Sequence, residues 1–175
     1  KEAILDYTKA IEIQPYNSHY YYNRGLSKGR INDHKGAIKD YNKAIEINNK
    51  DAYSFLLRGV SKAHLGDIEE AINDYSKSLE INPNISDSYN RRGLELVKIS
   101  KEEEAVNDYE IAIDIDPERP TYYINLGQAK SNLGDSESAI SNYTRAININ
   151  PKNASAYSKR GLEYINTKNY KEAIR

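Results

Sequence analysis

The stretch AYSFLLRGVSKAHLGDIEEAINDYSKSLEINPNI, residues 52–85, matches its neighbours on both sides when the chain is shifted by 34 residues. Its pattern Ala-x3-Tyr-x2-Ala/Ser starts at Ala71 and recurs at the same step from Ala3, Ala37, Ala105 and Ala139, with Ala173 beginning a further copy. A second pattern, aromatic-x2-Arg-Gly, starts at Tyr21, Phe55, Tyr89 and Tyr157, whereas the copy at Tyr123 carries Leu126 in place of arginine. Self-similarity at this fixed step predicts a solenoid whose units bury their faces on one another.

Each unit is predicted to form two helices. In residues 52–85 the second helix has an apolar side made of Ile68, Ala71, Ile72, Tyr75 and Leu79. Gly66 suits the left-handed position that ends the first helix, and Asp67 with Glu70 predicts a capping box for the second. Ser100 with Glu103 predicts the same box one unit later. Pro83 ends the second helix, because proline cannot continue the hydrogen-bond ladder.

Five glycines share one register in the middle of the first helices: Gly25, Gly59, Gly93, Gly127 and Gly161. Glycine in a helix interior costs about 1 kcal/mol relative to alanine. Its repetition indicates that another helix approaches too closely for a side chain. The small residues expected to face it are Ala37, Ala71, Ala105 and Ala139.

Composition narrows the classes of function. Lys+Arg 25 against Asp+Glu 26 gives a net charge of −1, which argues against a sequence-independent nucleic-acid binder. The absence of cysteine excludes disulfides, zinc–thiolate sites and thiol nucleophiles, and fits the cytosol and the periplasm alike. No run of about 18 apolar residues predicts a membrane span.

Catalytic chemistry has little support in the sequence. His19, His34 and His64 show no metal-ligand spacing and are interpreted as surface residues. Adjacent acids such as Glu102 and Glu103 lie where helices begin, a position that favours carboxylates. No Gly-rich phosphate loop is present. We therefore expect no enzyme activity, no metal and no cofactor.

The repeating residues resemble the tetratricopeptide repeat (TPR) family, whose pattern is aromatic at position 4, small at 8, small at 20, aromatic at 24, small at 27 and proline at 32. The resemblance spans the whole chain when each repeat is counted from Ser18, Ala52, Ser86, Pro120 and Ala154. It implies an all-α, right-handed superhelical solenoid of antiparallel helix pairs. Position 7, apolar in the family, is mostly arginine here and position 11 is often lysine, which predicts slightly looser packing.

On this numbering we expect one array over residues 1–175. Residues 1–17 form the second helix of a truncated repeat, residues 18–51, 52–85, 86–119 and 120–153 are full repeats, and residues 154–175 are a partial one in which a second helix begins at Lys171–Arg175. Neither end carries the polar face of a terminal repeat, so we expect a piece of a longer array with two adhesive ends.

Positions 2, 5, 6, 9, 12 and 13 of each first helix point away from its partner helix. The resemblance implies that they line a concave groove. The candidate groove residues are Tyr22, Asn23, Leu26, Arg30, Tyr53, Leu56, Leu57, Val60, Asn90, Arg91, Leu94, Lys98, Ile124, Asn125, Gln128 and Lys159. The apolar ones near the N-terminus either pack against neighbouring helices or form a patch that recruits a peptide. The same face carries one acid, Asp87, and four cations, which favours acidic ligands. The cations are Arg30, Arg91, Lys98 and Lys159.

Two binding modes of the family have partial counterparts in this sequence. The lysine–asparagine clamp for a chaperone C-terminal carboxylate has no complete match in any register. Position 6, with Asn23, Arg91, Asn125 and Lys159, faintly resembles a ladder of amides that holds a peptide backbone, but Leu57 interrupts it.

Three functions remain open at this level. The first is a scaffold that binds a peptide or a partner helix in its groove. The second is a targeting array whose catalytic domain lies outside these residues. The third is a structural array that associates end to end through its open faces.

Overall fold

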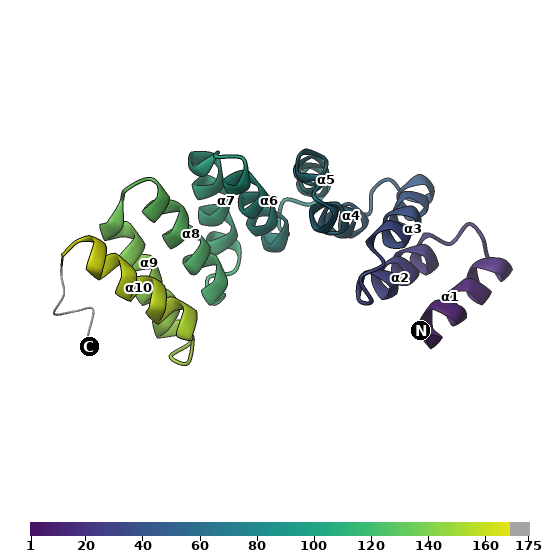
Figure 1. Ribbon diagram of the computed structural model, residues 1–175. Helices are drawn as coiled ribbons and strands as arrows, with labels where there is room; N and C mark the ends of the chain where they lie inside the picture. Colours follow the sequence, from purple (N-terminus) through teal and green to yellow (C-terminus); the bar gives the residue numbers. More distant parts are fainter. Residues whose placement is uncertain (169–175) are drawn as a thin grey trace. The chain divides into compact units, whose positions relative to one another are not determined.

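The computed structural model describes residues 1–168, and these residues fold into α-helices joined by short turns (Figure 1). The helices are α1 (Glu2–Ile13), α2 (Ser18–Gly29), α3 (His34–Ile47), α4 (Ala52–Leu65), α5 (Ile68–Ile81), α6 (Ser86–Lys98), α7 (Glu102–Ile115), α8 (Pro120–Asn132), α9 (Ser136–Ile149) and α10 (Ala154–Asn166). No strand occurs among the described residues. The expected start of a further helix at Lys171–Arg175 lies outside them.

The described residues divide into two compact units, residues 1–84 and 85–168. In the first unit, α2 packs on α3 and α4 on α5; in the second, α6 packs on α7 and α8 on α9. The first helices of successive pairs also touch, α2 with α4 in one unit and α8 with both α6 and α10 in the other. The expected all-α architecture of stacked helix pairs is confirmed.

Each helix pair is centred on one buried tyrosine from its second helix. Tyr41, Tyr75, Tyr109 and Tyr143 are each about 1% exposed, and alanines such as Ala71 and Ala105 beside them are fully buried. The close approach predicted at the glycine register is real, but the residue that fills the space is the tyrosine rather than the expected alanine. A Cβ on Gly59 would lie 2.8 Å from Cε1 of Tyr75, and only the backbone carbonyl of Ala71 comes near.

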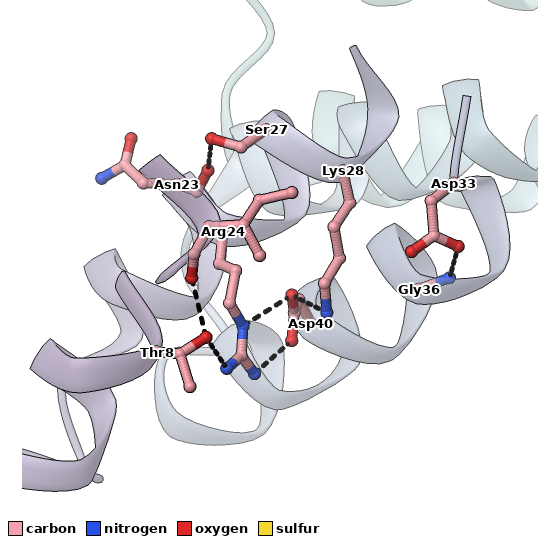
Figure 2. Close-up of polar contacts among 9 residues, drawn as sticks. Thr8, Asn23, Arg24, Ser27, Lys28, Asp33, Gly36 and Asp40 are labelled. Carbon is pink, nitrogen blue, oxygen red and sulfur yellow. Dashed lines mark hydrogen bonds and ion pairs between the residues drawn. The ribbon is translucent and has the colours of Figure 1, made fainter. Parts of the chain in front are cut away.

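A buried ion cluster replaces the apolar contact expected at repeat position 7. Arg24 on α2 donates from Nε and Nη2 to the two carboxylate oxygens of Asp40 on α3, at 3.0 and 2.7 Å, and Lys28 reaches the same carboxylate at 2.7 Å (Figure 2). The Asp40 side chain is only 4% exposed. The sequence analysis did not foresee this ion cluster, in which a forked guanidinium satisfies both carboxylate oxygens at once.

The same cluster recurs at the next pair and, in part, in the second unit. Arg58 and Lys62 hold Asp74, and Arg92 holds Asp108, with nitrogen–oxygen distances of 2.6 to 2.8 Å. The remaining guanidinium nitrogen also reaches the preceding helix pair. Arg24 Nη1 donates to Thr8 on α1, Arg58 Nη1 to Asn42 on α3, and Arg160 Nη1 to Thr144 on α9. The guanidinium therefore joins consecutive pairs.

The turn inside each pair uses one left-handed residue at repeat position 15. Gly66 and Gly134 have φ of 89° and 82° there, as expected for glycine, whereas Ser100 has φ of 58°. Ser100 therefore ends one helix instead of capping the next, and Lys101 occupies the N-cap of α7. The capping box predicted for Asp67 and Glu70 is also wrong, since Asp67 lies at the N-cap of α5 but its side chain accepts no cap bond.

Candidate functional site

The predicted groove residues of the first unit lie on α2 and α4, two helices that contact each other. Tyr22, Leu26, Leu57 and Val60 are half-buried, while Arg30 and Tyr53 are exposed, Tyr53 by 51%. Tyr22 packs against the ring of Tyr41, with ring centroids 6.2 Å apart. Tyr22 is therefore held by a contact with the core residue Tyr41, and the apolar side chains of this face remain partly accessible to solvent.

Two hollows mark this face. One, of about 330 Å³, lies at the start of α2 and α4 and is lined by His19, Tyr22, Lys50, Asp51 and Tyr53 together with Ser18 and Asn48. Asp51 is already engaged there, since its carboxylate accepts from Tyr53 N and Ser54 Oγ. Burial, together with the charge of Asp51, raises the pKa of Tyr22, so its hydroxyl stays protonated and able to donate.

The other hollow, of about 160 Å³, lies between the C-terminal ends of α2 and α4 and the start of α3. Its walls combine aliphatic, aromatic and basic side chains: Leu26, Gly29, Arg30, His34, Tyr41, Leu57, Val60, Ser61 and His64. His34 and His64 stack within it, with ring centroids 4.3 Å apart and an interplanar angle of 11°. His19 and His64 are exposed, as interpreted from the sequence, while His34 is half-buried.

Three predicted groove residues face the core instead. Leu56 is 4% exposed, Asn90 is 7% and Ile124 is 8%. Ile124 packs with Tyr143 of α9 and Ala156 of α10. Ile124 therefore lies between consecutive helix pairs of the second unit. Leu56 is buried, as the packing explanation expects, while Leu26, Leu57 and Val60 remain partly accessible.

In the second unit, the predicted residues already bond to one another. Asn125 Nδ2 donates to Asn90 Oδ1 at 2.7 Å, and Lys159 Nζ donates to Gln128 Oε1 at 2.5 Å. Asn23 in the first unit likewise donates to the carbonyl of His19 on its own helix. Leu94 is 39% exposed, and Arg91 is half-buried. The amides of the suggested backbone ladder therefore have intramolecular partners.

Acidic residues at repeat position 10 were missed by the sequence reasoning. Glu95, 6% exposed, pairs with Lys98 at 2.8 Å, and Glu163, 4% exposed, accepts from Ser131 Oγ at 2.5 Å. Asp87 accepts from the hydroxyl of Tyr122 at 3.1 Å. The second unit is consequently less basic on this face than the sequence predicts. A signal existed, since glutamate interrupts a position that is serine or alanine in the other full repeats.

The described residues hold no group of three or more side chains able to ligate a metal ion. Within residues 1–168, no helix combines the length and apolar character that crossing a bilayer requires.

Comparison with known families agrees with this geometry. Patterns described as tetratricopeptide repeat match residues 18–51 and 52–85, and one described as TPR repeat matches residues 93–134 and 132–167. The chain belongs to the tetratricopeptide repeat family. TPR arrays are generally non-catalytic scaffolds for protein interactions, and this TPR chain has the architecture of such a scaffold.

Solved structures share the fold. A MamA protein is 24% identical over 90% of this chain and 86% of its own, with a TM-score of 0.82. MamA 41-end from Desulfovibrio magneticus RS-1 is 22% identical over 90% and 89%, with a TM-score of 0.83. YrrB, described as a TPR protein with an unusual peptide-binding site, is 23% identical over 95% and 86%, with a TM-score of 0.81. No curated protein matches the TPR chain in sequence.

Proposed function

We propose that this TPR chain is a scaffold that holds a peptide or a partner helix against the exposed faces of its first helices. The observation that carries the proposal is the α2–α4 face of the first unit. There Tyr22, Tyr53, Leu57 and Val60 keep part of their apolar surface in water around two hollows. Exposed apolar clusters with polar rims are typical of interaction sites.

Charge supports an acidic partner. Arg30 at the rim of the smaller hollow and Arg91 on α6 have no carboxylate within ion-pair distance among the described residues. Lys98, in contrast, is already paired with Glu95. Cations that lack an intramolecular partner attract complementary charge and increase the association rate. We therefore expect acidic peptides to be preferred over basic peptides of matched hydrophobicity.

A random peptide display library tests this function on the whole chain. Selection should enrich sequences that combine apolar residues with aspartate or glutamate. Tyr22→Ala combined with Leu57→Ala should weaken the selected peptides at least tenfold, the loss expected when interface anchors are truncated. Arg91→Ala, made separately, reports whether the second unit takes part.

Ile13→Ala is the matched control, because Ile13 on α1 is equally apolar, is 78% exposed and lines neither hollow. Its binding should equal that of the unmodified chain. Failure to enrich any sequence, or enrichment of basic peptides whose binding is unchanged by the double substitution, would contradict the proposal.

A second candidate function, self-association, has its own observation. Leu5 on α1 is 67% exposed, and Leu162 and Ile165 on α10 are 56% and 49% exposed. Two such faces on different parts of one molecule suit a head-to-tail contact between copies. Sedimentation equilibrium over a wide concentration range should then show a rising mean mass, and a constant monomer mass would remove this candidate.

A further inference from the structure

The stacked histidines have an unusual placement for neutral surface residues. His34 is the first residue of α3 and His64 lies in the last turn of α4, so the contact joins two consecutive helix pairs within the first unit. The Nδ1 atom of His34 is buried and has no hydrogen-bond partner among the described residues. A buried polar atom without a protein partner is costly, and the His34 ring that carries it also lines the smaller hollow.

The surroundings of His34 oppose its protonation. Burial and the neighbouring ring of His64 lower the pKa of His34, and Asp33 opposes this effect. Asp33 is partly occupied, because its carboxylate accepts the Gly36 N–H at 2.9 Å. The other charged or titratable groups that border the hollow are Arg30 and Tyr41, and burial raises the pKa of Tyr41, which keeps its hydroxyl neutral. The hollow therefore has basic groups and lacks a lining carboxylate.

The size of the hollow limits its guest. A cavity of about 150 Å³ lined by aliphatic and aromatic groups holds a molecule the size of benzene. The hollow between α2, α3 and α4 measures about 160 Å³, and Leu26, Leu57 and Val60 supply its apolar wall. One leucine or phenylalanine side chain fits this volume, while two do not.

We propose that this hollow is a proton-coupled anchor site: it takes one leucine-sized side chain of a peptide, and Arg30 with the imidazolium of His34, which stacks on His64, binds a carboxylate beside that side chain. The inference rests on the proposed function, since it names the site and the partner chemistry for the first unit. Burial of the apolar side chain anchors the peptide, and its carboxylate supplies the negative charge that complements the basic groups of the hollow.

Binding at such a site depends on pH in a definite direction. A bound carboxylate favours the charged form of an adjacent imidazole and raises its pKa. The complex then holds more protons than the free protein at mildly acidic pH, so affinity increases as the pH falls from neutrality. An aspartate in the peptide, with a pKa near 3.9, stays ionised at pH 5.5.

Three end-blocked peptides, Gly-Asp-Leu-Asp-Gly and its counterparts with alanine for leucine or asparagine for both aspartates, test the proposal with a rhodamine label in fluorescence anisotropy. The first should bind about tenfold more tightly at pH 5.5 than at pH 7.5, the factor that one pKa unit produces. The asparagine peptide should bind weakly at both values. The alanine peptide should lose affinity at both.

Variants of the full chain assign the pH effect. The combined His34→Gln and His64→Gln change should remove the difference between the two pH values while leaving weak binding at pH 7.5. Lys35→Gln is the control, because Lys35 is an exposed cation next to His34 that lines neither hollow, and its pH ratio should match that of the unmodified chain. Far-ultraviolet circular dichroism checks that each variant is folded.

Calorimetry on the unmodified chain gives an answer that needs no variant. Titration at pH 6 in two buffers of different ionisation enthalpy should show a net uptake of protons for each peptide bound. Zero uptake, or a pH ratio that persists in the double glutamine variant, overturns the inference. If library-selected peptides bind without any pH dependence, the anchor site fails while the scaffold function stands; if no peptide binds, both fail.

Discussion

The α4–α5 pair of the first unit and the α8–α9 pair of the second solve the same packing problem with different chemistry. Between α4 and α5, Arg58 and Lys62 surround the buried carboxylate of Asp74. At the equivalent places of α8 and α9, Leu126 is buried and Asn142 donates to the carbonyl of Ser138 on its own helix. The lysine of that pair, Lys130, lies 3.6 Å from Glu110 on α7 instead.

The difference shows that the two positions change together. A buried aspartate without its arginine leaves an uncompensated charge, which costs several kcal/mol. Replacement of arginine by leucine in α8 therefore goes with replacement of aspartate by asparagine in α9, so that no buried carboxylate loses its partner. A hydrogen-bonded ion pair and an apolar side chain are therefore alternative ways to fill the same place between the two helices of a pair.

The largest expected effect comes from removing the arginine of one buried ion pair. Arg58→Leu should destabilise the first unit by about 3 kcal/mol, since Asp74 keeps only Lys62 as its cation. Adding Asp74→Asn should restore most of the loss, because the double variant reproduces the arrangement of α8 and α9. Urea unfolding followed by circular dichroism measures both, and a double variant as unstable as the single one would contradict the comparison.

The glycine–tyrosine contact is what the two pairs share, and Gly127→Ala tests it. The added Cβ would lie 2.6 Å from Cε1 of Tyr143, so overpacking should cost about 2 kcal/mol. Gly29→Ala on α2 is the control, since nothing lies within 4 Å of its added Cβ and alanine favours the helix by up to about 1 kcal/mol. Equal effects of the two substitutions in urea unfolding would argue against the contact.

The turns sharpen the comparison further. Ser100 occupies between α6 and α7 the left-handed position that Gly134 occupies between α8 and α9. Ser100→Gly should stabilise the chain by about 1 kcal/mol, because the left-handed conformation penalises residues with a Cβ. Gly134→Ser should cost about the same amount. Thermal denaturation of both variants checks the opposite signs.

The smallest expected effect separates the two units by pH. All three histidines lie in the first unit, and the pKa of His34 is lowered from its ordinary value by burial and by His64. The unfolded chain therefore binds the proton more readily, so stability of the first unit should fall as the pH drops below about 6.5. Hydrogen exchange at pH 7.5 and 5.5, corrected for intrinsic rates, should show this loss in residues 1–84 and no comparable loss in residues 85–168.

Most of the fold could be predicted from the sequence. The 34-residue step locates the helices, because turn residues recur at the place of Gly66 and proline recurs at the place of Pro83 in all but one repeat. The register of Tyr75 and Ala71 identifies the buried side of the second helix. These features are local or strictly periodic, and periodicity averages out the ambiguity of any single segment.

The parts that failed depend on contacts between helices. Arg58 and Asp74 are 16 residues apart, and only the antiparallel packing of α4 on α5 brings them together, so arginine alone looked like a departure from an apolar position. The stacking of His34 on His64 depends on where α3 begins relative to the end of α4. For the groove, helical spacing placed Ile124 on an open face, because it could not show that α9 and α10 cover this residue.

The third bond of the bridging arginines bears on how such an array is built. Its acceptor on the preceding helix is a threonine hydroxyl at Thr8 and Thr144 but an amide oxygen at Asn42. The guanidinium N–H can donate to either kind of oxygen, since any oxygen with a free lone pair can accept this hydrogen bond. A duplicated repeat could therefore pack on a new neighbour without a compensating substitution at this contact. This property favours growth of the array by gene duplication.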